Sequence, residues 1–421
     1  MNLLSLSMRG LLRNSRRSLT TLLAIALGFA AIALFAGYTH NIYHGLSLQA
    51  IHGELLGHLS LYRRGMNREG KLDPERYLLT GKAVARITAL VEKEPHVTLV
   101  TPRLTLSGII SNGRASTIFV AEGVEPAAAR ELHAGLPQTL QWHKEGTEAT
   151  GGVESLDPDK PSSVALAQGL TDLLHLKLGD QAVLLSNTLG GQANALDVTV
   201  GGVFNTGNAS TNDLYAFIPL ALVRSLYDAA GRADRLTILL DDVSQTEAVR
   251  AHLMAKLTAA GFDLEIRTWN ELSAFYTQVH GMFDIIFGFI FSIVITVVVM
   301  SVANSMGMTV VERTREIGTL RALGLRRFGV IQLFVGEAAL LTLIGCTVGL
   351  LLTMAVRYGI NTANISYEPP NMSGHVPLLV DLDQSRILLT TLMMATVGAL
   401  AAWLPARRAS RQAIIEALSH V

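Results

Sequence analysis

Long apolar runs alternate with more polar segments along this chain. Four runs are apolar enough, and long enough, to cross a bilayer as a helix, which takes about 20 residues. They are Ser18–Tyr38, Phe283–Val302, Leu333–Val356 and Ile387–Leu404, the last being followed by Pro405. The pattern therefore predicts four membrane helices, the second of which we expect to end at Asn304 and Ser305.

The region from about residue 41 to 275 has a different pattern. Short runs rich in Val, Ile, Leu and Phe predict strands, and stretches with helical periodicity predict helices. The predicted strands are Val97–Leu106, Thr117–Val120, Ala182–Ser186, Val198–Phe204 and Leu236–Leu240. The predicted helices are Gly81–Glu94, Ser163–Leu174, Leu220–Ala229 and Thr246–Ala260. Because the order shows no regular βαβ series, we expect an α+β domain.

Arginine residues gather at one end of each apolar run. They are Arg9, Arg13, Arg16 and Arg17 before the first run, Arg313, Arg315, Arg321, Arg326 and Arg327 between the second and third, and Arg407, Arg408 and Arg411 after the fourth. By contrast, Tyr358–Ser385 contains neither Lys nor Arg. The positive-inside rule then places both termini and the middle loop in the cytoplasm. The large α+β region and the loop 358–385 face the opposite side.

The fold class that follows is a membrane protein with four transmembrane α-helices and a large extracytoplasmic α+β domain inserted between helices 1 and 2. We expect a cytoplasmic amphipathic N-terminal helix (1–17), helix 1 (18–39), a periplasmic domain with stalks (40–282), helix 2 (283–303), a cytoplasmic coupling region (304–332), helix 3 (333–357), a periplasmic loop (358–385), helix 4 (386–404) and a cytoplasmic tail (405–421). The first run is longer than the core of a usual signal peptide, so we expect it to remain as a helix.

Composition agrees with such a mixture. The chain has 421 residues, of which 49% are hydrophobic and 16% charged, and its mean hydropathy is +0.36. These values are too apolar for a typical soluble protein and too polar for membrane spans alone. The net charge is zero, so there is no basic field of the kind that binds nucleic acid. Cys346 is the single cysteine, which excludes a disulfide within one chain.

The charged segment between the second and third runs carries the most specific pattern. Its residues are Glu312, Arg313, Thr314, Arg315, Glu316, Ile317, Gly318, Thr319, Leu320, Arg321, Ala322, Leu323 and Gly324. Ile317, Leu320 and Leu323 recur at helical spacing, whereas the charged residues supply a polar face. Gly324 is suited to end the helix. A short amphipathic helix at a cytoplasmic membrane face is suited to dock into a groove of a soluble partner.

At these residues the chain resembles the FtsX-like permease family of ABC transporters, which includes MacB-type macrolide exporters and LolC/E-type lipoprotein-releasing permeases (type VII exporters). The family signature E-R-x-R-E-I-G-x-x-R-A-L-G is matched at every fixed position from Glu312 to Gly324. Weaker similarities lie at Leu176–Asp180 and Val200–Gly207, and the resemblance is good again at Pro405–Arg411. The chain departs from the family where Ile415 stands in place of a proline before the final Glu-Ala-Leu.

The third apolar run contains one acidic residue and two regularly spaced glycines. Glu337 lies near its cytoplasmic end, where it could pair with Arg313, Arg315, Arg326 or Arg327, or extend to water. Gly345 and Gly349 have the Gly-x-x-x-Gly spacing that allows two membrane helices to pack closely. The spacing does not say which helix is the partner.

Sites for chemistry are not apparent in the sequence. It contains no G-x-x-x-x-G-K-[ST] loop for nucleotide phosphates, and no H-E-x-x-H, C-x-x-C or G-x-S-x-G. His40, His44, His52 and His58 are near one another in sequence, but we interpret them as polar residues of a stalk. We therefore predict no catalytic residues, no metal site and no cofactor in this chain, and expect that it is not an enzyme.

The resemblance implies a permease in the bacterial inner membrane. Its expected partners are a cytoplasmic ATPase subunit that binds ATP and Mg²⁺, a second identical or different permease chain, membrane lipid, and a periplasmic adaptor, chaperone or lipoprotein. It would transmit motion to its periplasmic domain to act on a lipoprotein, lipid or exported peptide or drug. One alternative is a signalling subunit that activates a cell-wall hydrolase without transport. Another is a membrane-anchored enzyme with its active site in residues 41–275, which no catalytic constellation supports.

Overall fold

The computed structural model describes residues 15–70, 72–137, 152–157, 159–367 and 376–412. Most of the expected N-terminal amphipathic helix and the end of the tail (413–421) lie outside these residues. The chain forms two compact units. We call residues up to 43, 279–365 and from 377 onward the membrane unit, and residues 44–278 with 366–376 the inserted domain.

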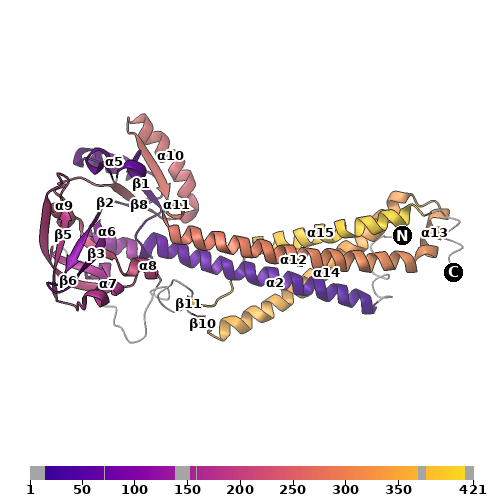
Figure 1. Cartoon of the computed structure of the whole chain (residues 1–421). Coiled ribbons are helices and arrows are strands. Elements are labelled where there is room, and N and C mark those ends of the chain that lie inside the picture. Colours follow the sequence, from indigo (N-terminus) through magenta and orange to yellow (C-terminus); the bar gives the residue numbers. More distant parts are fainter. Residues whose placement is uncertain (1–14, 71, 138–151, 158, 368–375, 413–421) are drawn as a thin grey trace. The chain divides into compact units, whose positions relative to one another are not determined.

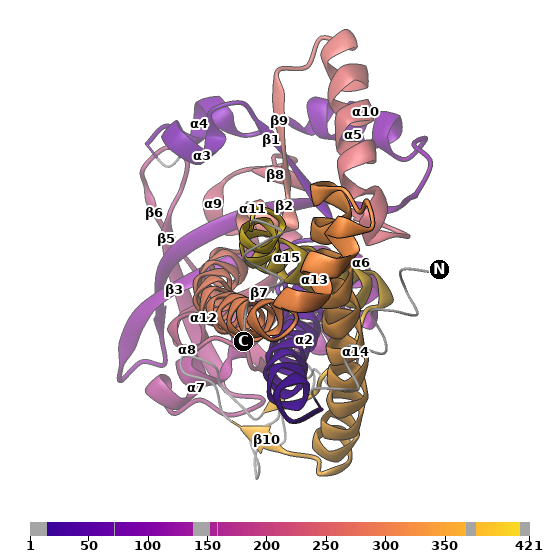
Figure 2. The ribbon, with the colours of Figure 1, turned by 90° about the vertical axis from the view of Figure 1, so that its right-hand side faces the viewer.

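Four long helices make up most of the membrane unit. They are α2 (Ser15–Leu48), α12 (Ala274–Glu312), α14 (Arg327–Thr362) and α15 (Gln384–Ser410), and each contains a span long and apolar enough to cross a membrane. A short helix, α13 (Thr314–Ala322), follows α12, and the helices of the unit lie side by side (Figures 1 and 2). The expected end of the second helix at Asn304 and Ser305 is wrong, because α12 continues to Glu312 while its side chains Met306 and Val310 remain buried.

Small residues let these helices approach one another. Two glycines of α14, Gly345 and Gly349, face α2: a Cβ on Gly345 would lie 2.6 Å from Cγ2 of Ile25, and one on Gly349 would lie 2.7 Å from the carbonyl oxygen of Ala26. The close packing predicted for this spacing is therefore present, and the partner helix is α2. Gly398 of α15 packs in the same way against Thr342 of α14.

A short stretch of backbone before α15, residues 378–383, is held against the helices. The side-chain amide of Asn361 donates to the carbonyl of Val380 (3.2 Å) and accepts from its amide (3.0 Å). The amide of Asp381 donates to the carbonyl of Gly37 in α2 (3.1 Å). A Cβ on Gly37 would lie 2.8 Å from the carbonyl oxygen of Asp381, so glycine is needed for this contact. We call residues 378–383 the strap.

The described residues of the inserted domain form a sheet of nine strands. They are β1 (Leu59–Arg63), β2 (Val97–Ser111), β3 (Ser116–Val124), β4 (Ser163–Ala167), β5 (Gln181–Asn187), β6 (Ala193–Phe204), β7 (Tyr215–Pro219), β8 (Arg235–Leu240) and β9 (Leu264–Thr268). The strand order is β3-β7-β4-β6-β5-β2-β8-β1-β9, and β2 also pairs with β3. A further two-stranded sheet is formed by β10 (Ser366–Tyr367) and β11 (Val376–Pro377).

Because β2 pairs with both β5 and β3, six strands close into a ring: β2, β3, β7, β4, β6 and β5. We call this part, with α7 (Gln168–Leu174), α8 (Ala209–Asn212) and α9 (Leu220–Tyr227), the ring lobe. Its core includes Leu104, Phe119, Leu184 and Val223. A second core (Ile51, Leu55, Leu132, Val153, Phe217 among others) packs with α6 (Pro126–Ala134), the π-helical turn η1 (Gln49–Gly53) and the 3-10 turn η3 (Val153–Ser155).

The remaining strands β8, β1 and β9 form the other part, which we call the three-strand lobe. The helices α5 (Gly81–Val91) and α10 (Thr246–Ala259) cover this sheet through buried residues such as Ile87 and Leu253. Short helices α3 (Met66–Glu69), α4 (Pro74–Tyr77), α11 (Trp269–Leu272) and the turn η4 (Val243–Gln245) complete the domain. The first half of β2 pairs with β8, so this strand belongs to both lobes (Figure 1).

The α+β prediction is confirmed, and each predicted strand coincides with an observed one, although the observed strands are longer. Of the predicted helices, Ser163–Leu174 is wrong in its first half, since Ser163–Ala167 is the strand β4. All five residues of β4 are buried. A short apolar run buried on both faces lacks the alternation that distinguishes a strand from a helix.

The segments expected as stalks are helical for most of their length. Residues 40–48 belong to α2, and η1 follows at Gln49–Gly53. On the other side, α11 ends at Leu272, and Ser273 adopts an extended conformation (ψ 98°) before α12 begins. The helices α2 and α12 thus each contain residues of both units.

Candidate coupling site

The segment with the E-R-x-R-E-I-G signature forms α13, set between α12 and α14. The helix begins at Thr314 rather than at Glu312, because Arg313 leaves the helical conformation (φ −104°, ψ 16°). At the other end Gly324 has a φ of +101°, a left-handed conformation that glycine adopts without strain. This glycine ends the helix as expected, and α14 begins three residues later at Arg327.

One face of α13 is buried in the membrane unit. Ile317 is only 3% exposed and packs with Val310, Phe334, Ala406 and Ala409, which belong to α12, α14 and α15. The hydroxyl of Thr314 donates to the carbonyl of Val310 (3.0 Å). Arg321 donates to the carbonyl of Gln412, beyond the end of α15. The helix is therefore attached to three neighbouring helices.

An ion pair adds a second attachment. The guanidinium of Arg313 lies 3.0 Å from Oε2 of Glu337 in α14, and its Nε lies 2.8 Å from Oε2 of Glu316. The same guanidinium lies over the ring of Phe334, 5.8 Å from its centroid. The side chain of Glu337 is 3% exposed. Of the four arginines expected as partners of Glu337, the structure selects Arg313, and the carboxylate does not reach water.

The turn after α13 and the first turn of α14 carry exposed apolar residues. Leu323 is 80% exposed and Phe328 is 66% exposed. The other exposed residues of the segment are Glu312, Arg315, Glu316, Thr319, Ala322, Gly324, Arg326 and Arg327, whereas Leu320 and Arg321 are half-buried. Leu323 and Phe328 are thus exposed in a segment that also exposes Arg315, Arg326 and Arg327.

These positions change the interpretation of the amphipathic pattern. Ile317, Leu320 and Leu323 do not form one exposed apolar stripe: Ile317 faces the helices of its own chain, whereas Leu323 faces outward. Phe328 was not among the predicted residues of the docking segment. The signal that could have revealed it is an aromatic residue directly after Arg326 and Arg327 and before the apolar run of α14.

The histidines near the start of the inserted domain have separate structural partners. Nδ1 of His52 lies 2.7 Å from the carbonyl oxygen of Leu132. Nδ1 of His58 accepts from the amide of Leu240 (3.0 Å), and burial lowers the pKa of His58 to about 4, which keeps this nitrogen an acceptor. Across the described ranges, no group of three or more His, Cys, Asp or Glu side chains has the geometry of a metal site.

The fold and the site define a class: a membrane protein with four helices and a large domain inserted after the first. Two family models match the chain. The MacB-like periplasmic core domain matches residues 18–256, and the FtsX-like permease C-terminal domain matches residues 288–414. The chain therefore belongs to the FtsX-like permease family with a MacB-like periplasmic core domain, as the motif resemblance predicted.

Individual relatives agree with this assignment. Over 120 residues the chain is 36% identical to the macrolide export ATP-binding/permease protein MacB of Escherichia coli K12, and equally to that of Shigella flexneri. The match spans 28% of this chain but only 17% of the length of these relatives.

Two solved structures are also similar to part of the chain. The periplasmic region of MacB from Actinobacillus actinomycetemcomitans is 16% identical with a TM-score of 0.36, covering 53% of this chain and 93% of that one. The extracellular domain of the transporter YknZ from Gram-positive bacteria is 12% identical with a TM-score of 0.34, covering 50% of this chain and 99% of that one.

Proposed function

We propose that this chain is the permease subunit of an ABC transporter, in which a separate ATPase subunit hydrolyses ATP and drives movement of the inserted domain. The observation that carries the proposal is the two-sided character of α13. Its inner face is fixed to three helices by Ile317 and the Arg313–Glu337 pair. Leu323, directly after the last residue of α13, and Phe328, in the first turn of α14, are exposed, as residues that dock on a partner must be.

The exposed residues specify the chemistry of the ATPase surface. Leu323 and Phe328 would enter an apolar pocket, because removal of exposed apolar side chains from water favours binding. Arg315, Arg326 and Arg327 are exposed in the same segment and would face acidic side chains of the ATPase. Arg313, Glu337 and Ile317 would hold the helix in place without touching the partner.

Orientation follows from the arginine distribution. The segment with α13 carries five arginines, so it would lie in the cytoplasm together with both termini. The inserted domain would then lie in the periplasm of a bacterium and the helices in its inner membrane. Because the chain lacks a nucleotide-binding loop, ATP and Mg²⁺ would bind the partner, and this chain would be neither an enzyme nor a holder of cofactors.

Motion would reach the inserted domain through the two helices that contain residues of both units, α2 and α12. α12 leads directly to α13, and α2 is packed on α14 at Gly345 and Gly349. A displacement of α13 would bias two states of these helices. With a second, identical or different permease chain, the complex would act on a lipoprotein, lipid, or exported peptide or drug delivered through a periplasmic adaptor or chaperone.

The test is a pull-down of the tagged chain in a mild detergent, with mass spectrometry of the bound proteins. The wild type should retain an ABC ATPase, and Leu323→Asp and Phe328→Asp should lose it. Leu72→Asp is the matched control, since Leu72 is 88% exposed but lies in the inserted domain. Retention of the full amount of ATPase by both variants would contradict the docking site. Recovery of an ATPase with a cell-wall hydrolase, and no cargo or adaptor, would favour signalling over transport.

A further inference from the structure

The strand β2 passes from one lobe of the inserted domain to the other. Its residues Val97–Arg103 pair with β8 of the three-strand lobe, and Leu104–Ser111 pair with β3 of the ring lobe. The change of partner falls between Arg103, which pairs with Arg235, and Leu104, which pairs with Gly123. A strand that changes partners in this way is a point at which two lobes can bend.

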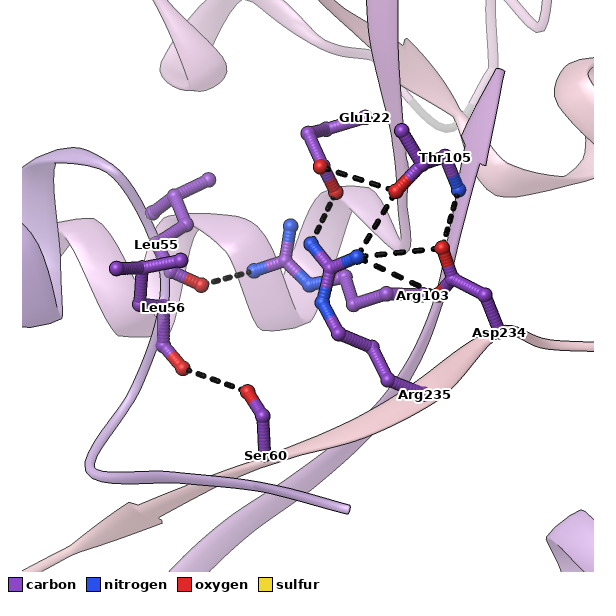
Figure 3. A network of polar contacts seen from close by, with 8 residues as sticks. All are labelled: Leu55, Leu56, Ser60, Arg103, Thr105, Glu122, Asp234 and Arg235. Atoms are coloured by element: carbon purple, nitrogen blue, oxygen red, sulfur yellow. Dashed lines mark hydrogen bonds and ion pairs between the residues drawn. The ribbon is translucent and has the colours of Figure 1, made fainter. Parts of the chain in front are cut away.

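A buried cluster of charged side chains occupies this point (Figure 3). Arg235 of β8 forms an ion pair with Glu122 of β3, and its Nη1 lies 3.2 Å from Oδ2 of Asp234. Thr105 accepts from Arg235 (2.9 Å) and donates to Glu122 (3.1 Å). The cluster therefore joins side chains of the three-strand lobe to side chains of the ring lobe.

The backbone of β2 takes part as well. The amide of Thr105 lies just past the last residue of β2 that pairs with β8, and it donates to Oδ2 of Asp234 (2.8 Å). On the edge of β2 where β8 no longer pairs, the carboxylate of Asp234 thus accepts the hydrogen bond of the Thr105 amide. Burial raises the pKa of Asp234, while Glu122 and Asp234 outweigh burial and raise that of Arg235, so the arginine stays charged.

Arg103 connects the same point to the segment that follows α2. Its guanidinium is 1% exposed and donates to the carbonyl of Leu55 (3.0 Å) (Figure 3). Leu55 has a φ of +58°, a conformation that is strained for a residue with a branched side chain and persists only where surrounding contacts fix it. The left-handed turn directs the Leu55 carbonyl to Arg103 and buries the Leu55 side chain, which is 1% exposed.

Such a cluster contributes little net stability, because desolvation of the charges offsets their attraction. The cluster does fix the relative orientation of the strands that carry it. A guanidinium that moves away from its acceptors leaves a buried charge unpaired. Bending at β2 would separate Glu122 from Arg235. The cost of that separation, several times larger than that of a surface pair, opposes bending.

We propose that Arg103, Glu122, Asp234 and Arg235 form a rigid joint that fixes the angle between the two lobes and attaches them to the segment after α2. The inserted domain then responds to α2 as a single body. This property of the domain does not depend on the ATPase, so it can be tested separately from the proposed function.

The first test measures the distance between spin labels on the two lobes of the full-length protein in detergent. Cysteines replace Ala89 of α5 and Ser225 of α9, both exposed, and the native Cys346 is 2% exposed. The wild type should give one narrow distance distribution. Glu122→Gln should lose it and give a broad one. Thr105→Val is the milder variant if Glu122→Gln does not fold, and should broaden the distribution less.

Asp263→Asn is the matched control, because it breaks the exposed pair of Arg64 and Asp263 within the three-strand lobe. It should leave the distribution narrow. Distributions as narrow as that of the wild type in both Glu122→Gln and Thr105→Val would overturn the proposal, and any accompanying drop in melting temperature would then reflect stability alone.

A second test addresses the attachment to α2. In Arg103→Met the amides of Leu56 and Gly57, which donate to Ala50 and Ile51 of η1, should exchange with deuterium faster than in the wild type. Amides of α10 should keep their wild-type rate. Unchanged exchange at Leu56 and Gly57 would show that Arg103 does not hold this segment.

Discussion

The guanidinium of Arg313 lies 3.0 Å from the carboxylate of Glu337, and this contact joins the break between α12 and α13 to α14. Both partners are largely shielded, with side-chain exposures of 19% and 3%. Residues 313 and 337 are separated by the whole coupling segment, so the pair closes that segment into a loop of fixed geometry. The pair therefore fixes the start of α13 to α14 as well as to α12.

Removal of one partner should be more harmful than removal of both. Arg313→Met leaves the carboxylate of Glu337 buried and unpaired, which costs about 3 kcal/mol or more. The double variant Arg313→Met/Glu337→Leu should recover most of this loss. Unfolding of the purified protein in detergent, followed by tryptophan fluorescence, measures both. Arg326→Met is the control, since Arg326 is exposed; equal losses from the single and double variants would contradict the pairing.

Two glycines of the same helix should differ in their tolerance of a methyl group. A Cβ on Gly349 would lie 2.7 Å from the Ala26 carbonyl, whereas one on Gly336 would meet nothing within 4 Å. Gly349→Ala should destabilise the protein by about 1–3 kcal/mol, because a backbone neighbour cannot move aside easily. Gly336→Ala should be neutral or slightly stabilising. Thermal unfolding of the two variants side by side decides the matter, and equal effects would mean that α2 does not pack on α14 at Gly349.

The length of the apolar runs was enough to find the membrane helices, and short apolar runs revealed the strands β2, β3, β5, β6 and β8. Gly324 could also be predicted, since the left-handed φ of +101° that ends α13 favours glycine. The helix that packs on Gly345 and Gly349 could not be predicted, because the spacing of small residues indicates close packing of a helix but does not identify that helix. Ile25 and Ala26 are more than 300 residues away in the chain.

The inward face of α13 was unpredictable for a similar reason. Ile317 is buried by Ala406 and Ala409 of α15, residues whose small size carries no signal of its own. The ion cluster at β2 was equally hidden, because Arg103 and Arg235 occur within strands that otherwise read as apolar. Charged residues of this kind show their partners only once the strand register, Arg103 opposite Arg235, is known.

One of the side chains that hold the strap can be tested directly, although Arg357 also donates to the carbonyl of Val380 (3.0 Å). Asn361 makes two hydrogen bonds to the backbone of Val380, together worth about 2 kcal/mol. Asn361→Ala should therefore speed deuterium exchange of the Val380 amide by roughly 10- to 30-fold. Thr362→Val is the control, because the hydroxyl of Thr362 donates only to carbonyls of its own helix. If the amide of Val380 exchanges at the wild-type rate in Asn361→Ala, other contacts hold the strap.

Stability should fall as pH rises through the range in which Glu54 titrates. Burial raises the pKa of Glu54 from 4.5 to about 7, so between these values the unfolded chain releases a proton that the folded chain retains. The free energy of unfolding then decreases with rising pH, by at most about 3 kcal/mol, and stays constant above pH 7 as far as this group is concerned. Glu54→Gln should lack this pH dependence. The free energy of unfolding of the wild type relative to that of the variant should therefore fall from pH 4.5 to 7 and stay constant at higher pH. Denaturant unfolding of both proteins at a series of pH values measures that difference, and a constant difference across the whole range would mean that Glu54 titrates as it does in water.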